Sequence, residues 1–479
     1  MNNSNNKPFR PFIILITVLG FLIMLSTIDH YFAQFNHDIK HLDLLSQITI
    51  KQKDTLLHSV TVKNDENFEK ILKDTLSQWS DTLQNVNVVK DTVKGLDSFY
   101  EGLRNIKTKK KIRIAWFGDS MVEGDLITQE LRAILQKKYG GSGVGIVPIT
   151  SVTAGFRRTI NHTFSENWKN KNLLDPISDE ALGITGYVFN PQILTISDTS
   201  NPIPADASWV RYKSSKMRGL DKFHKVRLYY GLPTDIDASV HIEIDNMTRI
   251  NKILNGKEPV NTLEIDNEQK TFNEIKFTFI NRQQLPVYAV SFESDTGVFV
   301  DNLSFRGNSG LPLSKIPQHI LAEFNEKNQY DLIILEYGMN AVSAEITDYS
   351  WYQRGLDRIV KHIKRSFPNT ALLFIGVPDK GYKDINGYIT NPAIPLVINA
   401  ERNAAENNGA AFWNLFEAMG GYNSMVKWVE SDTALANKDY THFNFRGASK
   451  VARLLYQELD KGYNEYLKST ENKQKNLSY

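Results

Sequence analysis

An apolar run, Ile112–Trp116, leads into Phe117-Gly118-Asp119-Ser120, and this junction constrains the fold of the chain more than any other feature. The run predicts a buried strand, and apolar residues at helical spacing between 126 and 138 predict a helix after it. Such strand–turn–helix units build α/β folds, whose functional sites lie outside the carboxyl ends of the strands. We therefore expect the hydroxyl of Ser120 at the edge of a sheet.

A serine at such an edge needs a base before it can act as a nucleophile. The segment Asp439-Tyr440-Thr441-His442, just ahead of an amphipathic stretch at 445–459, offers one. An Asp three residues before a His can hold the imidazole in one tautomer while the other ring nitrogen faces the serine, as in a Ser-His-Asp triad. These residues predict a serine esterase or acyltransferase.

Each candidate residue also has a structural interpretation. Ser120 and Asp439 could each cap a helix, and Asn340 could be a turn residue. The catalytic interpretation is favoured because these residues follow one another in the right order at the ends of predicted strands. Asp379, at another strand end, could line a substrate pocket, but a loop cap is the favoured interpretation.

Strand and helix patterns alternate through the C-terminal half of the chain. Repeated units of this size imply a parallel sheet covered by helices on both faces. The predicted strands are 331–337, 371–377 and 411–415, and the predicted helices are 351–366, 395–407 and 445–459.

Between about 150 and 305 the pattern changes to short alternating runs separated by Pro, Gly, Asn and Asp, which is typical of an all-β sandwich. Examples are the runs at 226–230, 239–244, 276–280 and 287–292. We expect an inserted module whose aromatic residues mostly lie in its core, although any of them could stack on a sugar ring. The aromatic candidates are Trp168, Tyr187, Trp209, Tyr212 and Tyr229.

A glycine-dense stretch, Gly140–Gly145, ends the first strand–turn–helix unit and precedes the predicted sandwich. It follows a predicted helix and lacks the Lys-Ser/Thr ending of a phosphate-binding loop, so that role is not favoured. We expect a flexible loop near the site.

The composition excludes several classes of function. The 56 basic and 54 acidic side chains give a net charge of +2, so the chain lacks the basic field that nucleic-acid binding requires. No cysteine is present, which rules out a thiol nucleophile, disulfides and cysteine-ligated zinc. We expect neither a cofactor nor a metal.

The N-terminus predicts a membrane anchor. Pro11–Ile28 carries no charge and is long enough to span a bilayer, and Lys7 and Arg10 precede it. The residues after it offer a poor cleavage site, which favours a retained signal-anchor over a cleaved signal peptide. The basic flank stays cytoplasmic, so we expect the rest of the chain outside the cytoplasm, in the periplasm.

Three short motifs together resemble a known family. Gly118-Asp119-Ser120, Gly338-x-Asn340 and Asp439-x-x-His442 look like blocks I, III and V of the SGNH (GDSL-like) hydrolases, and Phe305–Ser309 matches block II less strongly. The first block continues Met121-Val122-Glu123 in place of the common Leu-ending form. The resemblance covers about residues 111–150 and 297–461.

The resemblance implies a role for each matched residue. Ser120 would be the nucleophile, His442 the general base and then acid, and Asp439 the residue that orients His442. The oxyanion would accept hydrogen bonds from the backbone N–H groups of Ser120 and Gly307 and from the side-chain amide of Asn340. Gly307 is chosen over Gly310 for the second donor.

The order of the segments predicts the domains and narrows the subfamily. An anchor, an exported SGNH domain and an inserted sandwich are similar to the peptidoglycan O-acetylesterases and their relatives, so the resemblance implies an esterase acting on an acetylated cell-envelope or extracellular polysaccharide. The alternatives are a polysaccharide O-acetyltransferase, working beside a membrane acyl-donor protein, and a non-catalytic glycan-binding scaffold. The expected domains are a cytoplasmic N-terminus (1–10), a transmembrane anchor (11–30), a partly helical spacer (31–110), a flavodoxin-like three-layer SGNH domain (111–150 and 297–465), an inserted sandwich (151–296) and a polar tail (466–479).

Overall fold

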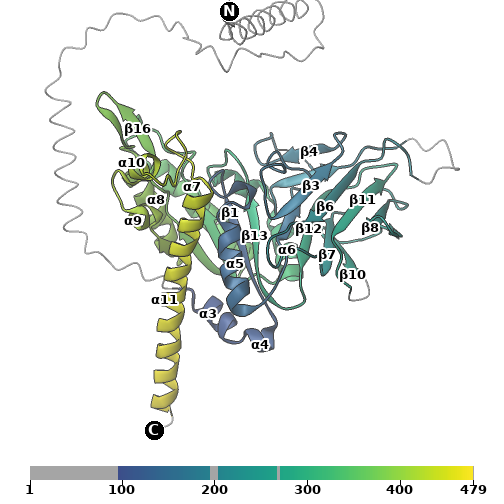
Figure 1. The fold of residues 1–479 in the computed structure, drawn as a ribbon, viewed down its shortest axis with the longest axis horizontal. Helices are drawn as coiled ribbons and strands as arrows, with labels where there is room; N and C mark the ends of the chain where they lie inside the picture. Colours follow the sequence, from purple (N-terminus) through teal and green to yellow (C-terminus); the bar gives the residue numbers. More distant parts are fainter. Residues whose placement is uncertain (1–94, 178, 195–202, 267–269, 478–479) are drawn as a thin grey trace, which may run out of the picture. The chain divides into compact units, whose positions relative to one another are not determined.

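A parallel sheet of five strands forms the centre of the fold (Figure 1). The computed structural model describes residues 95–477, apart from 178, 195–202 and 267–269. The strands are β1 (Lys111–Gly118), β13 (Gly297–Ser304), β14 (Leu332–Glu336), β15 (Ala371–Ile375) and β18 (Ala411–Trp413). They lie in the order β13-β1-β14-β15-β18, and every neighbouring pair is parallel. Counted along the chain this is the order 2-1-3-4-5 of flavodoxin-like sheets, which confirms the predicted fold class of this domain.

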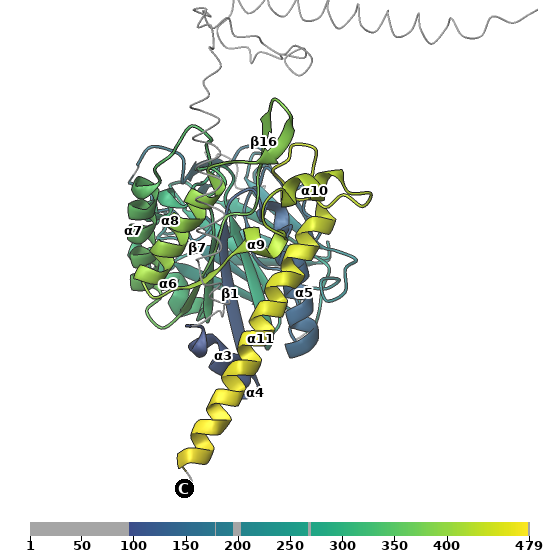
Figure 2. The same ribbon diagram turned by 90° about the vertical axis from the view of Figure 1, so that its left-hand side faces the viewer.

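Helices cover both faces of this sheet, because its strands are apolar on both sides. Figure 2 shows α5 (Thr128–Tyr139) and α11 (Phe445–Leu477) together on one face, where they contact each other. On the other face α6 (Gln318–Asn328), α7 (Ser350–Ser366) and α8 (Ile394–Asn407) pack in a row. The predicted three-layer arrangement is therefore present.

Two antiparallel sheets are inserted between α5 and β13. One has the order β10-β7-β12-β5-β4 with β2 added against β12, and the other has the order β3-β6-β11-β8-β9. Val226 and Val290 of the first sheet share a hydrophobic core with Val210 and Phe277 of the second, so the insertion is a β-sandwich. Its strands are β2 (Gly145–Pro148), β3 (Ile160–Phe164), β4 (Lys169–Asn172), β5 (Tyr187–Asn190), β6 (Trp209–Ser214), β7 (Lys225–Tyr230), β8 (Ser239–Ile244), β9 (Thr248–Ile253), β10 (Asn261–Asp266), β11 (Glu274–Ile280) and β12 (Val287–Glu293).

The sandwich begins earlier than the sequence indicates. We expected 111–150 to belong to the α/β domain, but β2 pairs with β12 and so extends a sandwich sheet. The glycine stretch before it is also placed differently from our prediction. Gly140 accepts a hydrogen bond from the N–H of Val298, at the start of β13, 2.9 Å away. This is the amino edge of the parallel sheet, opposite Ser120, because α5 runs back across the sheet.

These glycines allow close backbone packing. A Cβ on Gly141 would lie 2.9 Å from the Val298 nitrogen, and a Cβ on Gly143 would lie 2.3 Å from the Phe292 carbonyl oxygen. The prediction of a flexible loop near the site is therefore wrong.

The described end of the predicted spacer (95–110) and the first residue of the predicted tail, Tyr466, pack on other parts of the chain. The helix α3 (Asp97–Arg104) lies within the predicted partly helical spacer and buries Phe99 and Leu103 in the main core. Its Tyr100 packs against Tyr463 and Tyr466 of α11, with ring centroids 6.0 Å apart in each case. The last helix continues through the expected polar tail to residue 477, and its contact with α3 is made by Tyr463 and by Tyr466, where that tail begins.

The remaining short elements lie in loops. They are α4 (Ile106–Lys109), the 3-10 turns η1 (Glu123–Asp125) and η2 (Leu311–Lys315), the hairpin β16 (Gly381–Asp384) and β17 (Gly387–Thr390), and the helices α9 (Leu415–Met419) and α10 (Ser424–Glu430). Within residues 95–477, no helix combines the length and apolar character needed to span a bilayer. The predicted anchor at 11–30 lies outside the described residues.

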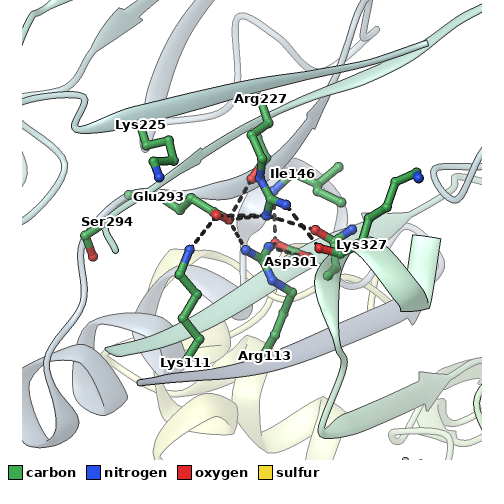
Figure 3. Close-up of polar contacts among 12 residues, drawn as sticks. Lys111, Arg113, Ile146, Lys225, Arg227, Glu293, Ser294, Asp301 and Lys327 are labelled. Carbon is green, nitrogen blue, oxygen red and sulfur yellow. Dashed lines mark hydrogen bonds and ion pairs between the residues drawn. The ribbon is translucent and has the colours of Figure 1, made fainter. Parts of the chain in front are cut away.

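A buried group of charges joins the sandwich to the parallel sheet (Figure 3). Glu293, at the end of β12, accepts hydrogen bonds from Arg113 of β1, from Arg227 of β7 at 2.8 Å and from Lys111 at 2.8 Å. Arg113 also donates to both carboxylate oxygens of Asp301 on β13, at 3.1 and 3.0 Å. Arg113, Glu293 and Asp301 are almost inaccessible to solvent, so each charge depends on its partners.

Neutralising Glu293 should destabilise the fold. Glu293→Gln removes the carboxylate that Arg113, Arg227 and Lys111 share, and removal of one partner from a buried ion cluster costs about 3–5 kcal/mol. The matched control is Asp295→Asn, because Asp295 pairs with Lys225 at 3.0 Å but is 78% exposed. That change should cost at most about 1 kcal/mol. Denaturant unfolding of the purified variants measures both, and equal small losses would contradict the expectation.

Candidate active site

Ser120 lies at the carboxyl end of the central strand. The N–H of Phe305 donates to the Gly118 carbonyl at 2.8 Å, which marks the end of β1 beside β13. Beyond it the chain turns tightly, because the N–H of Met121 donates to the Asp119 carboxylate at 2.9 Å. Ser120 is half-buried there, between the ends of β13 and β14. This is the switch point of the sheet, where α/β folds place their ligands.

The structure brings the predicted serine, histidine and aspartate together. Ser120 Oγ lies 3.0 Å from His442 Nε2, and His442 Nδ1 lies 2.8 Å from Asp439 Oδ2. The two ends of this chain of hydrogen bonds come from β1 and from the loop between α10 and α11. The nucleophile, base and orienting acid of a triad have this geometry.

Asp439 is held in its ionised form. Although burial acts to raise the pKa of Asp439, hydrogen bonds from His442 and from the Thr441 N–H keep that pKa below its ordinary value. The N–H groups of Thr441 and His442 both donate to Asp439 Oδ1 at 3.0 Å. The side chains of His442 and Asp439 are 36% and 48% exposed, so the site is open to a large substrate.

The capping interpretations of Ser120 and Asp439 do not fit the structure. The N-cap residue of α5 is Ile127, and the side chain of Asn444 accepts from the first N–H groups of α11, those of Arg446 and Gly447. Asp379, in contrast, is a cap as favoured: its carboxylate accepts from the Met425 N–H at 2.7 Å at the start of α10.

The backbone N–H groups of Ser120 itself and of the nearby Gly307 are available to a ligand. Within the described part of the chain, the N–H groups of Ser120 and Gly307 donate to no other group. Gly307 has a φ of 73°, a conformation that glycine adopts without strain. The only described atom within 4 Å of an added Cβ there is Cδ1 of Leu174, at 3.7 Å.

Asn340, the third predicted donor, follows β14, and its side chain reaches the segments that follow β1 and β13. Its Nδ2 donates to Asp119 Oδ2 at 2.9 Å and to the Asn308 carbonyl at 3.1 Å. These contacts hold the amide between the segments that follow β1 and β13. All five predicted site residues thus lie at one edge of the sheet.

The contact of Asp119 was missed by the sequence reasoning. Asp119 lies within the Gly-Asp-Ser motif, but its partner Asn340 is 221 positions away, and no local pattern predicts that pairing. Burial raises the pKa of Asp119 to about 6. Burial, followed by the charge of Asp119, also raises the pKa of Glu336 to about 8, so Glu336 is largely neutral beside it.

A second missed feature supports the loop that carries the histidine. Tyr440 lies between Asp439 and His442, and its ring stacks on Tyr388 of β17 with centroids 3.6 Å apart and planes 7° apart. The N–H of Gly381 donates to the Tyr440 carbonyl at 2.7 Å. The hairpin β16–β17 therefore holds the loop in place. Among the described residues, no group of three or more His, Asp or Glu side chains could hold a metal ion.

By sequence, the chain matches no protein-family model and no curated protein. Among solved structures, a peptidoglycan O-acetylesterase is similar over 77% of this chain and 96% of its own, with 20% identity and a TM-score of 0.61. An acetylxylan esterase from Geobacillus stearothermophilus covers 34% of this chain and 73% of its own, with 17% identity and a TM-score of 0.27. A lipase/acylhydrolase from Enterococcus faecalis covers 34% and 76%, with 17% identity and a TM-score of 0.25.

The likeness to the peptidoglycan O-acetylesterase covers 77% of this chain and has the highest TM-score of the three. It agrees with the 2-1-3-4-5 parallel sheet and with the resemblance of the sequence motifs. The chain therefore has the fold of the SGNH hydrolase superfamily, with a β-sandwich inserted between its first and second strands.

Proposed function

We propose that this protein is a serine ester hydrolase that removes O-acetyl groups from a cell-envelope or extracellular polysaccharide. The observation that carries the proposal is the hydrogen-bonded chain from Ser120 Oγ to His442 Nε2 (3.0 Å) and from His442 Nδ1 to Asp439 (2.8 Å). It lies beside two N–H donors that have no other partner among the described residues.

The reaction follows from this arrangement. Ser120 Oγ attacks the carbonyl carbon of the ester while His442 Nε2 takes the hydroxyl proton. The tetrahedral intermediate then expels the sugar oxygen, which receives that proton from His442 and leaves an acetyl group on Ser120. A water molecule attacks the acetyl carbonyl, with His442 again taking a proton, and acetic acid leaves as Ser120 Oγ regains its hydrogen. Asp439 keeps Nδ1 of His442 protonated and stabilises the imidazolium.

The oxyanion of each tetrahedral intermediate is stabilised by the N–H groups of Ser120 and Gly307 and by Asn340. One N–H of the Asn340 amide stays on Asp119, at 2.9 Å. The other donates to the Asn308 carbonyl at 3.1 Å. An oxyanion is a stronger acceptor than this neutral carbonyl, so the second N–H can turn to it as charge develops.

Two observations support a polymeric acetyl ester as the substrate. The triad side chains are exposed enough for a polymer to reach them, and the similar solved structure is of a peptidoglycan O-acetylesterase. Of the five aromatic candidates in the sandwich, Tyr212 and Tyr229 are fully buried and Trp168 is nearly so, which leaves only the half-buried Tyr187 and Trp209 to stack on a sugar. If a sugar hydroxyl replaced water in the second step, the same residues would transfer the acetyl group.

The nucleophile is tested with Ser120→Ala. The wild type should release acetate from O-acetylated peptidoglycan or xylan and become labelled on Ser120 by a fluorophosphonate, because only an activated serine reacts with that reagent. The variant should do neither, and the control Ser431→Ala, at an exposed serine, should do both. Equal labelling of Ser120→Ala would refute the nucleophile assignment. Turnover of an aryl acetate with no release from either polysaccharide would refute the substrate.

The partnership of Asp119 and Asn340 is tested by a double-mutant cycle. Asn340→Ala should lower kcat by about 10²–10³ with little change in KM, because it removes one oxyanion donor. If Asp119 acts by orienting this amide, adding Asp119→Asn, whose side-chain oxygen can still accept from the Met121 N–H, to Asn340→Ala should lower kcat no further. Losses that multiply would show that Asp119 acts by another route.

The control for this cycle is Asp379→Ala. Asp379 is a buried aspartate in the loop after β15, and its carboxylate accepts hydrogen bonds from Ser424 and Met425 at the start of α10. Its removal should reduce stability while the folded enzyme keeps its kcat, and circular dichroism reports the folded fraction.

We also propose that residues 11–30 anchor the protein in the inner membrane with the catalytic part in the periplasm. The support is the uncharged span Pro11–Ile28 behind Lys7 and Arg10. Protease added to spheroplasts should digest the part that contains Ser120. Protection of that part, while a known periplasmic protein is digested, would show the opposite orientation.

A further inference from the structure

The loop between β4 and β5 of the sandwich holds an exposed leucine in a defined position. The side chain of Leu174 is 54% exposed, yet its N–H donates to Asn172 Oδ1 at 2.9 Å. The N–H of Asn172 in turn donates to Asp175 Oδ2 at 2.9 Å. Side-chain to backbone bonds of this kind order a turn, so the position of Leu174 is built into the loop.

The α/β domain holds this loop on both sides of Leu174. Lys315, in η2, donates to the carbonyl of Leu173 at 2.8 Å and to that of Asp175 at 2.7 Å. Leu173 itself is buried in the core of the α/β domain. A residue of the inserted module is thus fixed against the domain that carries the triad.

The side chain of Leu174 lies beside Gly307, the residue whose N–H is the predicted oxyanion donor. Its Cδ1 lies 3.7 Å from the position that a Cβ on Gly307 would occupy. The Gly307 backbone is tied to the rest of the site, because the carbonyl of Asn308 accepts from Asn340 at 3.1 Å. An ester whose carbonyl oxygen accepts from the Gly307 N–H therefore lies close to this side chain.

We propose that Leu174 forms one wall of the acyl-binding pocket and limits the acyl group to one about as short as acetyl. The inference rests on the proposed ester hydrolysis. An O-acetylated sugar has a methyl group on one side of the ester carbonyl and a hydroxyl-rich ring on the other. The apolar Leu174 suits the alkyl side, because contact with the sugar would remove hydroxyl groups from water without giving them a partner.

The experiment compares p-nitrophenyl acetate with p-nitrophenyl butyrate in the full chain. The wild type should prefer the acetate, and Leu174→Ala should raise the butyrate-to-acetate ratio of kcat/KM by about tenfold or more, since each methylene in an apolar pocket changes discrimination by that order. Leu174→Phe should lower kcat/KM for both esters by narrowing the pocket. Lys315→Met, which frees the loop but keeps an apolar stem, should shift the ratio in the same direction as Leu174→Ala.

The matched control is Leu232→Ala. Leu232 belongs to the same module and is 57% exposed, but it lines a separate hollow with Pro259 and Pro286, so its substitution should leave the ratio unchanged. An active Leu174→Ala enzyme with the wild-type ratio would overturn the acyl-pocket role. A wild type that hydrolyses neither ester would instead refute the ester hydrolysis on which the inference rests, and the inference with it.

Discussion

The site depends on the parallel pairing of β1 with β13 on one side and β14 on the other. Because all three strands point the same way, the segments that follow them meet at one edge. Ser120 follows β1, Gly307 follows β13 and Asn340 follows β14, so one sheet register sets the relative positions of the nucleophile and two of its oxyanion donors. A shift of either pairing would move a donor along the strand by the rise of one residue, about 3.3 Å.

The inserted sandwich is part of this arrangement. Its last strand, β12, ends at Glu293, and β13 begins at Gly297, so the module continues almost directly into the sheet that positions Gly307. The ion cluster of Arg113, Glu293 and Asp301 then ties the two modules together in a region from which water is excluded. Buried ion pairs favour one geometry because any misplacement leaves a charge without a partner. Beside the catalytic edge, the contacts of Lys315 and the burial of Leu173 hold a loop of the sandwich in place.

Burial of acids near the serine has an energetic consequence. Asp119 is ionised above a pKa of about 6, and Glu336 stays mostly protonated below a pKa of about 8. Ionising Asp119 in a buried position opposes stability, whereas its contact with Asn340 orients a group that the proposed reaction uses. Carboxyl groups with a shifted pKa are common at functional sites, where the orientation of reacting groups is kept at some cost in folding stability.

The sequence by itself determined the order of the elements and the chemistry of the motif residues. Continuous apolar runs such as Leu332–Leu335 indicate strands that helices cover on both faces of the sheet. Ser120, His442 and Asp439 were predicted because their residue types and their order along the chain match a Ser-His-Asp triad. The tight turn after a strand also restricts where the side chain of Ser120 can lie. Local pattern carries this information because strand and helix periodicity act over a few residues.

Only the tertiary structure decided which distant groups meet. The contact of Asn340 with Asp119, the stack of Tyr388 on Tyr440 and the position of Leu174 beside Gly307 each join residues far apart in the chain. The glycines at 140–145 and the tyrosines of the last helix were misread for the same reason. A glycine that allows close backbone packing has the same local sequence pattern as a glycine in a flexible loop. A mostly polar helix has the same pattern as a solvated tail, because the sequence does not show which helix it contacts.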